Sequence, residues 1–135
     1  RDFSEKLNTS IAIIDKRRPE ANVSEVMNII GNVEGKNVIL VDDMIDTAGT
    51  ITQAAQALSK KGAKDIYATC THPLFSGPAI DRLKDSPIKE LVVTDTVLLP
   101  EDKQLEKLTT LSVAPLLASA IERIYEALSV SVLFD

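Results

Sequence analysis

Short apolar runs, rich in β-branched residues, recur along the chain and predict the strands of a sheet. Four runs have this composition: Ser10–Asp15, Asn37–Asp42, Asp65–Cys70 and Glu90–Asp95. Their apolar residues are more continuous than alternating, which is typical of strands that are covered on both faces. The pattern therefore predicts a buried, parallel sheet.

Two stretches have the spacing of amphipathic helices. The apolar stripe of the first consists of Ile51, Ala54, Ala55 and Leu58. It is followed by Lys60, Lys61 and Gly62, which supply cationic residues in the last turn and a left-handed stop. The second stripe follows Pro115, a residue that the first turn of a helix tolerates, and consists of Leu117, Ile121, Ile124 and Leu128. Strands that alternate with helices predict an α/β fold, with an open, mainly parallel sheet flanked by helices and right-handed connections.

Two segments do not fit the core of a complete domain. The opening "RDFSEKL" resembles the last turns of a helix and contains no initiator methionine, so we expect a fragment of a longer protein in which residues 1–135 form one domain. The segment "KRRPEANVSEVMN", from Lys16 to about Asn28, is polar, irregular and longer than the connection requires. Long loops of this kind are often functional, and we expect a lid here.

Composition narrows the classes of function. The 135 residues are 44% hydrophobic and 26% charged, which suits one globular domain, and the formal net charge of -5 gives no general attraction to nucleic acid or anionic membrane. The single cysteine excludes an internal disulfide, and the sequence has no Cys/His cluster for structural zinc. No apolar run approaches the roughly 18 residues of a membrane span, and the first residues have no signal-peptide pattern. We expect a soluble, cytoplasmic protein without nucleic-acid or membrane partners.

The stretch "VILVDDMIDTAGT" combines acidic residues with a turn of small residues. In an open α/β sheet, ligands bind beyond the carboxyl ends of the strands. The turn Asp46–Thr50 leads into the first predicted helix, whose free N–H groups and dipole favour an anion. Ala48 and Gly49 allow a phosphate to approach the backbone, while the hydroxyls of Thr47 and Thr50 can donate further hydrogen bonds. Neither a P-loop lysine nor a G-x-G-x-x-G pattern occurs, so this predicts a phosphate site of another type.

The acidic pair Asp42 and Asp43 lies where the other end of a small ligand would fall. Carboxylates repel phosphates, but they accept charge-assisted hydrogen bonds from vicinal hydroxyls. A phosphate at one end and a diol at the other describe a pentose 5-phosphate. The local sequence leaves an alternative open: the pair forms an ordinary strand end or helix cap, and Asp46 or Thr47 only caps the helix.

The same stretch resembles the phosphoribosyl-pyrophosphate motif of the type I phosphoribosyltransferase fold. The wider sequence, with "DKRRPEANVSEVMNIIGNVEGKNVILVDDMIDTAGTI", "THPLFSGPA" and the terminal "SVSVLF", resembles the bacterial ribose-phosphate pyrophosphokinases. The resemblance covers essentially the whole chain. It implies a type I phosphoribosyltransferase-like domain that corresponds to the C-terminal half of such an enzyme.

The resemblance also implies a reaction and its residues. ATP, with Mg²⁺, would donate its β,γ-diphosphoryl group to the anomeric hydroxyl of ribose 5-phosphate, and AMP would leave. Lys16 and Arg18 would be the catalytic cations of a flexible loop, Asp42 and Asp43 would bind the ribose hydroxyls, and Asp46–Thr50 would bind the 5-phosphate. Cations at the transferring phosphoryl oxygens suit this chemistry. From the local sequence alone, a solvated basic patch is the alternative for the two cations.

Further expectations follow from the resemblance. Ser129, Val130 and Ser131 would help to form an effector site for phosphate or ADP at a subunit interface of a homo-oligomer. Most Mg²⁺ ligands and part of the adenine pocket would lie in the half that this chain lacks, so the fragment alone would be inactive. The alternative functions are a type I phosphoribosyltransferase and a non-catalytic regulatory homologue.

Three other residues could belong to a site. We interpret His72, the only histidine, as a packing or hydrogen-bonding residue because no partner triad is visible. Cys70 has no reactive context, which favours an inert residue of a buried strand. Asp95 follows a predicted strand and could be either a site residue or a turn residue.

Overall fold

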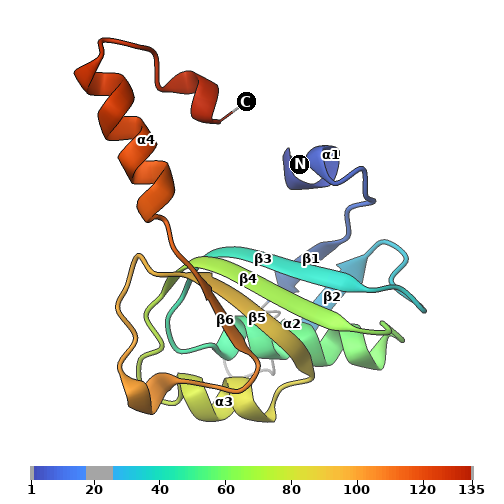
Figure 1. Cartoon of the computed structure of the whole chain (residues 1–135). Helices are drawn as coiled ribbons and strands as arrows, with labels where there is room; N and C mark the ends of the chain where they lie inside the picture. The colour runs from blue at the N-terminus through green and yellow to red at the C-terminus, as the bar shows by residue number, and fades with distance from the viewer. Residues whose placement is uncertain (1, 18–25, 135) are drawn as a thin grey trace.

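The computed structural model describes residues 2–17 and 26–134, which form two sheets and the helices around them (Figure 1). The elements follow in the order α1 (Asp2–Lys6), β1 (Ile13–Arg17), β2 (Val26–Ile30), β3 (Val38–Ile45), α2 (Gly49–Lys60), β4 (Ile66–Pro73), α3 (Ala79–Asp85), β5 (Ile88–Thr94), the 3-10 helix η1 (Glu101–Lys103), β6 (Leu108–Leu111), α4 (Ala114–Tyr125) and the 3-10 helix η2 (Ser131–Leu133). The fold is α/β, as predicted, and its main sheet is parallel.

The main sheet has four strands in the order β3-β4-β5-β6. Because neighbours in the sheet are also neighbours in the sequence, connections of one hand bring α2 and α3 onto the same face, as Figure 1 shows. The buried core lies between that face and the two helices. Its members include Ile51, Ala55, Leu58, Ile66, Ala68, Leu83, Leu91 and Val93.

The opposite face of the sheet is open at β3. Ile39, Val41 and Met44 of this strand have exposed fractions of 53%, 50% and 48%. The prediction of strands covered on both faces is therefore wrong for β3. A continuous apolar run shows that both faces of a strand are apolar, but it does not show that helices of the same chain cover both.

Strand boundaries also differ from the prediction. The predicted strand ended at Asp42, but β3 continues three residues further, so Asp43 also lies inside the strand. The run Ser10–Asp15 does not join the parallel sheet. Its second half belongs to β1, which pairs antiparallel with β2 from Ile13↔Ile30 to Arg17↔Val26. The predicted irregular lid therefore begins and ends as strand, and residues 18–25 lie outside the described part.

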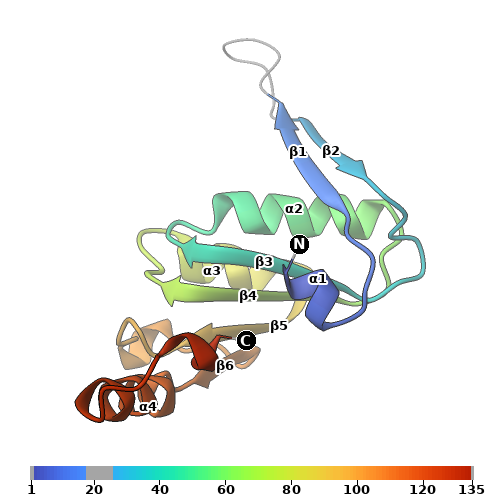
Figure 2. The same ribbon diagram turned by 90° about the horizontal axis from the view of Figure 1, so that it is seen from above.

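The base of the β1–β2 hairpin is fixed to the core. Ile29 and Val33 are buried with the residues that α2 contributes. The ammonium group of Lys61, directly after α2, donates a hydrogen bond to the carbonyl oxygen of Ile29. Gly31 has φ +124°, and a Cβ there would lie 3.1 Å from Cβ of Ala12. The hairpin itself projects away from the main sheet (Figure 2).

Both predicted helices are present, but only α2 packs as expected. Helix α2 buries its predicted apolar stripe. Helix α4 begins one residue before Pro115, which is at a first-turn position, yet it contains no buried residue. Figure 1 shows α4 standing away from the sheet. The short helix α1 agrees with the helical interpretation of the opening residues, whereas α3, β2 and β6 were not predicted.

Lys107 joins the end of α3 to β5. Its ammonium nitrogen donates to three main-chain oxygens, at 3.1 Å to Lys84, 3.0 Å to Ser86 and 3.1 Å to Ile88. Loss of hydration around this group lowers the pKa of Lys107. Lys107 thus binds carbonyl oxygens at the end of α3, where a helix leaves such groups without intrahelical partners, and one at the start of β5.

Candidate functional site

The acidic pair lies near the carboxyl end of β3. Asp42 and Asp43 are solvent-exposed, and Asp42 is opposite Cys70 of β4. The N–H of Asp43 donates to Oδ1 of Asp42 at 3.0 Å. Partial desolvation is the main cause that raises the pKa of Asp42, and the neighbouring carboxylate of Asp43 raises it further, whereas that N–H acts in the opposite direction. Two carboxylates are thus held next to each other in contact with solvent.

The turn between β3 and α2 has an unusual backbone conformation. Ala48 is buried, with φ 58° and ψ 8°, in the left-handed region that non-glycine residues rarely adopt. Gly49 begins α2. Such a conformation costs about 1 kcal/mol and persists only when surrounding contacts fix it, which is common at ligand sites.

Four consecutive N–H groups of this turn have no partner among the described residues. Across the described ranges, 2–17 and 26–134, no hydrogen bond is donated by the main chain of Thr47, Ala48, Gly49 or Thr50. The carboxylate of Asp46 accepts the hydroxyl of Ser76 instead of a helix N–H. The capping alternative therefore does not describe this turn, and its donors are available to an anion.

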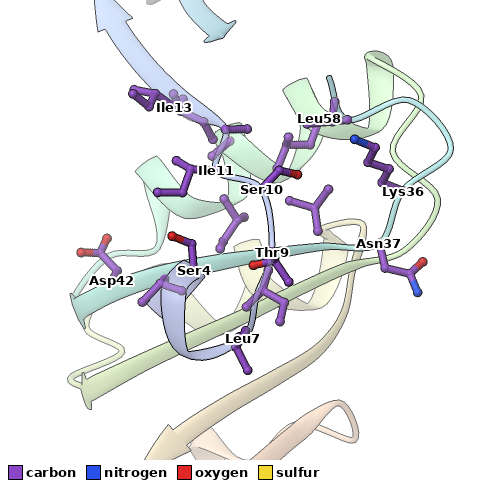
Figure 3. A pocket seen from close by; sticks show the side chains of 18 of the residues that line it. Ser4, Leu7, Thr9, Ser10, Ile11, Ile13, Lys36, Asn37, Asp42 and Leu58 are labelled. Atoms are coloured by element: carbon purple, nitrogen blue, oxygen red, sulfur yellow. The ribbon is translucent and has the colours of Figure 1, made fainter. Parts of the chain in front are cut away.

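Two pockets meet at Thr50. A large groove of about 1320 Å³ lies between β3 and the segment that links α1 to β1, and Figure 3 shows Asp42 at one end of it. A smaller, polar pocket of about 390 Å³ is lined by Thr47, Gly49, Thr50, Thr52, Gln53, Gln56 and Arg82. Thr50 lines both. A ligand at the turn would therefore have room toward the acidic pair.

Sequence reasoning missed the residues that support the turn from outside. Nη1 of Arg82, from α3, donates to the main-chain oxygen of Thr47 at 2.9 Å. The hydroxyl of Thr52 donates to the oxygen of Ala48 at 2.7 Å. Arg82 is 35 positions from its partner, so no local spacing connects the two. The only signal was that "THPLFSGPA", just before Arg82, forms part of the family resemblance.

The predicted catalytic and regulatory residues are not all described. Lys16 lies in β1 opposite Met27, whereas Arg18 is outside the described residues. Ser129 and Ser131 lie beyond α4 and share a hydrogen bond of 2.7 Å between their hydroxyls, with Val130 between them. In Figure 1 this segment is on the side of the sheet opposite α2. It is therefore a separate region from the turn.

The three remaining residues have structural partners. Nδ1 of His72 is 2.9 Å from Oγ1 of Thr96. Cys70 is buried, and burial is the main cause that raises the pKa of its thiol to about 11, which agrees with an inert residue. Asp95 accepts hydrogen bonds from the hydroxyl of Ser112 and the N–H of Val113. These bonds give Asp95 a structural role at the start of α4.

Comparison with known proteins decides the family. The model of the phosphoribosyl synthetase-associated domain matches residues 3–135. The chain belongs to the ribose-phosphate pyrophosphokinase family. It is 62% identical over 135 residues to the ribose-phosphate pyrophosphokinase of Bacillus caldolyticus and 66% identical over 134 residues to that of Caldanaerobacter subterraneus subsp. tengcongensis. These matches cover 100% and 99% of this chain, but only 43% and 42% of the relatives.

A solved structure of the family has the same fold. The phosphoribosylpyrophosphate synthetase from Mycobacterium smegmatis superposes with a TM-score of 0.85 and is 41% identical. The match covers 93% of this chain and 40% of the other. The predicted fold class is thus confirmed. The roles of individual site residues stay predictions.

Within residues 2–17 and 26–134, no group of three or more His, Cys, Asp or Glu side chains is placed to hold a metal ion. None of the described helices has the length and apolar character required to span a bilayer.

Proposed function

We propose that this chain is the C-terminal domain of a ribose-phosphate diphosphokinase and binds ribose 5-phosphate. In the intact enzyme, the β,γ-diphosphoryl group of ATP would pass to the C1 hydroxyl of ribose 5-phosphate, forming phosphoribosyl pyrophosphate and AMP. Family membership supports the reaction class. The C-terminal placement rests on the resemblance of the terminal "SVSVLF", and peptide mapping of the native protein tests it.

The turn after β3 carries the proposal. It presents the N–H groups of four successive residues, Thr47–Thr50, which no described group accepts, at the positive end of the α2 dipole. A phosphate monoester has several acceptor oxygens and a negative charge, so it complements this arrangement. Gly49 has no side chain, so a phosphate can approach the backbone at this position.

The acidic pair supplies the second half of the recognition. Asp42 and Asp43 are exposed on the strand that leads into the turn, and Asp42 and Thr50 line the same groove. Ionised carboxylates accept hydrogen bonds and donate none, so they suit sugar hydroxyls and reject a second phosphate. Ribose with its phosphate at the turn satisfies both groups.

The hairpin supports a catalytic role for the loop. Lys16 is the fourth residue of β1, and β1 and β2 lead to and from the segment that contains Arg18. Lys61 fixes the base of the hairpin to the C-terminal end of α2, and the proposed phosphate site lies at the other end of this helix. Phosphoryl transfer depends mainly on positioning and on neutralising charge, which suits cations carried near a bound substrate.

The proposal also includes a metal ion, effectors, an assembly and a cellular location. We propose that most Mg²⁺ ligands lie outside this chain, since the described residues contain no group of three or more His, Cys, Asp or Glu placed to hold a metal ion. Binding of phosphate or ADP at Ser129–Ser131 and a homo-oligomer remain predictions from the resemblance. A cytoplasmic location remains a prediction from the sequence.

Binding to the chain itself tests the site. In an NMR titration, ribose 5-phosphate should shift the amide signals of Thr47–Thr50, and ribose alone should not. Asp43→Asn should weaken binding of ribose 5-phosphate by about tenfold while leaving the weak binding of inorganic phosphate unchanged. Asp102→Asn, in exposed η1, is the matched control. Shifts confined to other residues would overturn the proposal.

Activity separates the alternatives. The chain alone should release no AMP from ATP and ribose 5-phosphate. In an intact parent enzyme, Lys16→Ala should abolish that release, whereas an unchanged rate would favour a regulatory homologue. Turnover of phosphoribosyl pyrophosphate with a purine or pyrimidine base, in place of ribose 5-phosphate with ATP, would identify a phosphoribosyltransferase.

A further inference from the structure

The carbonyl oxygens of the turn accept hydrogen bonds, whereas its N–H groups have no partner among the described residues. The main-chain oxygen of Asp46 accepts the N–H of Ser76 at 3.0 Å. The oxygen of Thr47 accepts Arg82 at 2.9 Å. The oxygen of Ala48 accepts the N–H of Thr52 at 3.2 Å and its hydroxyl at 2.7 Å, and that hydroxyl also lies 3.2 Å from the oxygen of Gly49. Four successive peptide units are thus held by their oxygens.

Each of these oxygens shares a peptide unit with one of the four free N–H groups. The oxygen of Thr47 and the N–H of Ala48, for example, belong to the same peptide. A hydrogen bond accepted by the oxygen polarises that peptide and makes its N–H a better donor. The effect is greatest when the outer donor is charged, because charge-assisted hydrogen bonds are roughly twice as strong as neutral ones. Arg82 is the charged donor in this set.

Arg82 also fits against the turn in a way that favours a glycine at position 49. A Cβ at Gly49 would lie only 3.3 Å from Nη1 of Arg82. The guanidinium therefore passes over the unbranched residue to reach the oxygen of Thr47. This explains a glycine at the first position of α2, where the backbone does not have positive φ.

We propose that Arg82 is a positioning residue for the phosphate turn: it holds the peptide between Thr47 and Ala48 so that the N–H of Ala48 points at the bound phosphate. Ser76 has the same role at the peptide between Asp46 and Thr47, because its N–H donates to the main-chain oxygen of Asp46, while its hydroxyl donates to the Asp46 carboxylate. This inference rests on the proposed function and adds the part that α3 and the segment before it play. In this role Arg82 acts through the backbone.

Titration of the 135-residue chain with ribose 5-phosphate, followed by NMR and calorimetry, tests this role. Arg82→Gln should weaken binding by about tenfold, the value of the charge-assisted hydrogen bond that the Ala48 N–H would no longer donate to the phosphate. It should also shift the ¹⁵N signal of Ala48 in the ligand-free chain. Arg82→Lys, which keeps the charge and one donor, should restore part of both effects. Lys84→Gln removes a charge from an exposed residue of the same helix and should change neither.

The outcomes are distinguishable. If the parent chain binds neither ribose 5-phosphate nor inorganic phosphate, the proposed function fails and this inference fails with it. If the parent binds and Arg82→Gln binds equally well, only the inference fails. It also fails if affinity falls while the ligand-free Ala48 signal stays in place, because Arg82 would then act on the ligand directly or through its charge. Should Arg82→Gln not fold, Arg82→Lys carries the test: it should weaken binding and shift the ligand-free Ala48 signal, and parent-like values of both would overturn the inference.

Discussion

Helices α2 and α4 are each 12 residues long and each have one apolar side, yet their surroundings are opposite. Helix α2 buries Ile51, Ala54, Ala55 and Leu58 together with Thr52. Helix α4 buries nothing, and Ile121 and Ile124 are both 68% exposed. An apolar stripe therefore predicts a helix with a face that favours burial. It does not predict what covers that face.

The connections explain the difference. Helix α2 links β3 to its parallel neighbour β4, so the chain has to cross the sheet, and the helix lies against it. Helix α4 follows β6, the edge strand of the sheet, and the described residues that follow α4, up to Phe134, form no strand that would pair with the sheet. The burial of an amphipathic helix thus depends on the strands at both of its ends.

The largest expected effect comes from shortening a buried side chain of α2. Leu58→Ala should lower the free energy of unfolding by about 2–5 kcal/mol, because Leu58 is 1% exposed and its removal leaves a cavity. The matched change in α4, Ile121→Ala, should cost less than about 0.5 kcal/mol. Urea unfolding measures both. A large loss for Ile121→Ala would show that α4 is covered in solution.

A hydroxyl inside α2 should have the next largest effect. Thr52→Val removes the hydroxyl that supports the oxygens of Ala48 and Gly49, and it should cost about 1 kcal/mol as well as weakening ribose 5-phosphate binding. Ser119→Ala, at a partly exposed position of α4, should change neither quantity measurably. Equal stability losses for the two variants would contradict the contrast between the helices.

The carboxylates that precede the two helices should respond to pH in opposite directions. The pKa of Asp42 is raised, so its charged form is less favourable in the folded chain than in the unfolded chain. Stability is therefore lost as pH rises through the ordinary aspartate range toward the raised value. Asp42→Asn keeps an acceptor for the N–H of Asp43 and should raise the melting temperature slightly at neutral pH, but not at a pH below that range. A lower melting temperature at neutral pH would contradict this sign.

Asp95, which precedes α4, should show the smallest effect. Its hydrogen bonds from Ser112 and Val113, in that order, lower its pKa. The stability from these bonds is present above the ordinary aspartate range and is lost as pH falls through the lowered pKa. A ¹³C NMR titration should place the midpoint of Asp95 below the ordinary aspartate range, and the amide signal of Val113 should move with it. A midpoint within that range would show that Asp95 does not hold the start of α4.

Local features of the fold followed from the sequence, and the pairing of distant parts did not. The stripe of α2 and its basic end predicted that helix almost to its last residue. The run at Ser10–Asp15 indicated a strand but gave no sign that β1 would pair with β2 outside the main sheet. Strand β3 continues through its acids because side chains at an open strand end remain hydrated, so charge did not end the strand there.

For the site, the sequence predicted the donors of the turn but not their support. The small residues of "DTAGT" indicated a phosphate turn, and the free N–H groups agree with that interpretation. The left-handed conformation of Ala48 was not predictable because alanine does not favour it. Arg82 and Ser76 reach the turn from α3 and the segment before it, so only the folded chain brings them there.

The ammonium of Lys107 has a consequence for chemical labelling. Its ammonium donates to carbonyl oxygens at the end of α3, just after it and at the start of β5, whereas Lys89 is exposed and pairs with Asp65 at 3.3 Å. Amine-reactive reagents attack the neutral amine, and the pKa of Lys107 is lowered while that of Lys89 is raised. At a pH above the ordinary lysine range, where this difference no longer favours Lys107, such reagents followed by mass spectrometry should modify exposed Lys89 first. The labelling rate of Lys107 would then report how often its hydrogen bonds open, and so would measure local unfolding between α3 and β5.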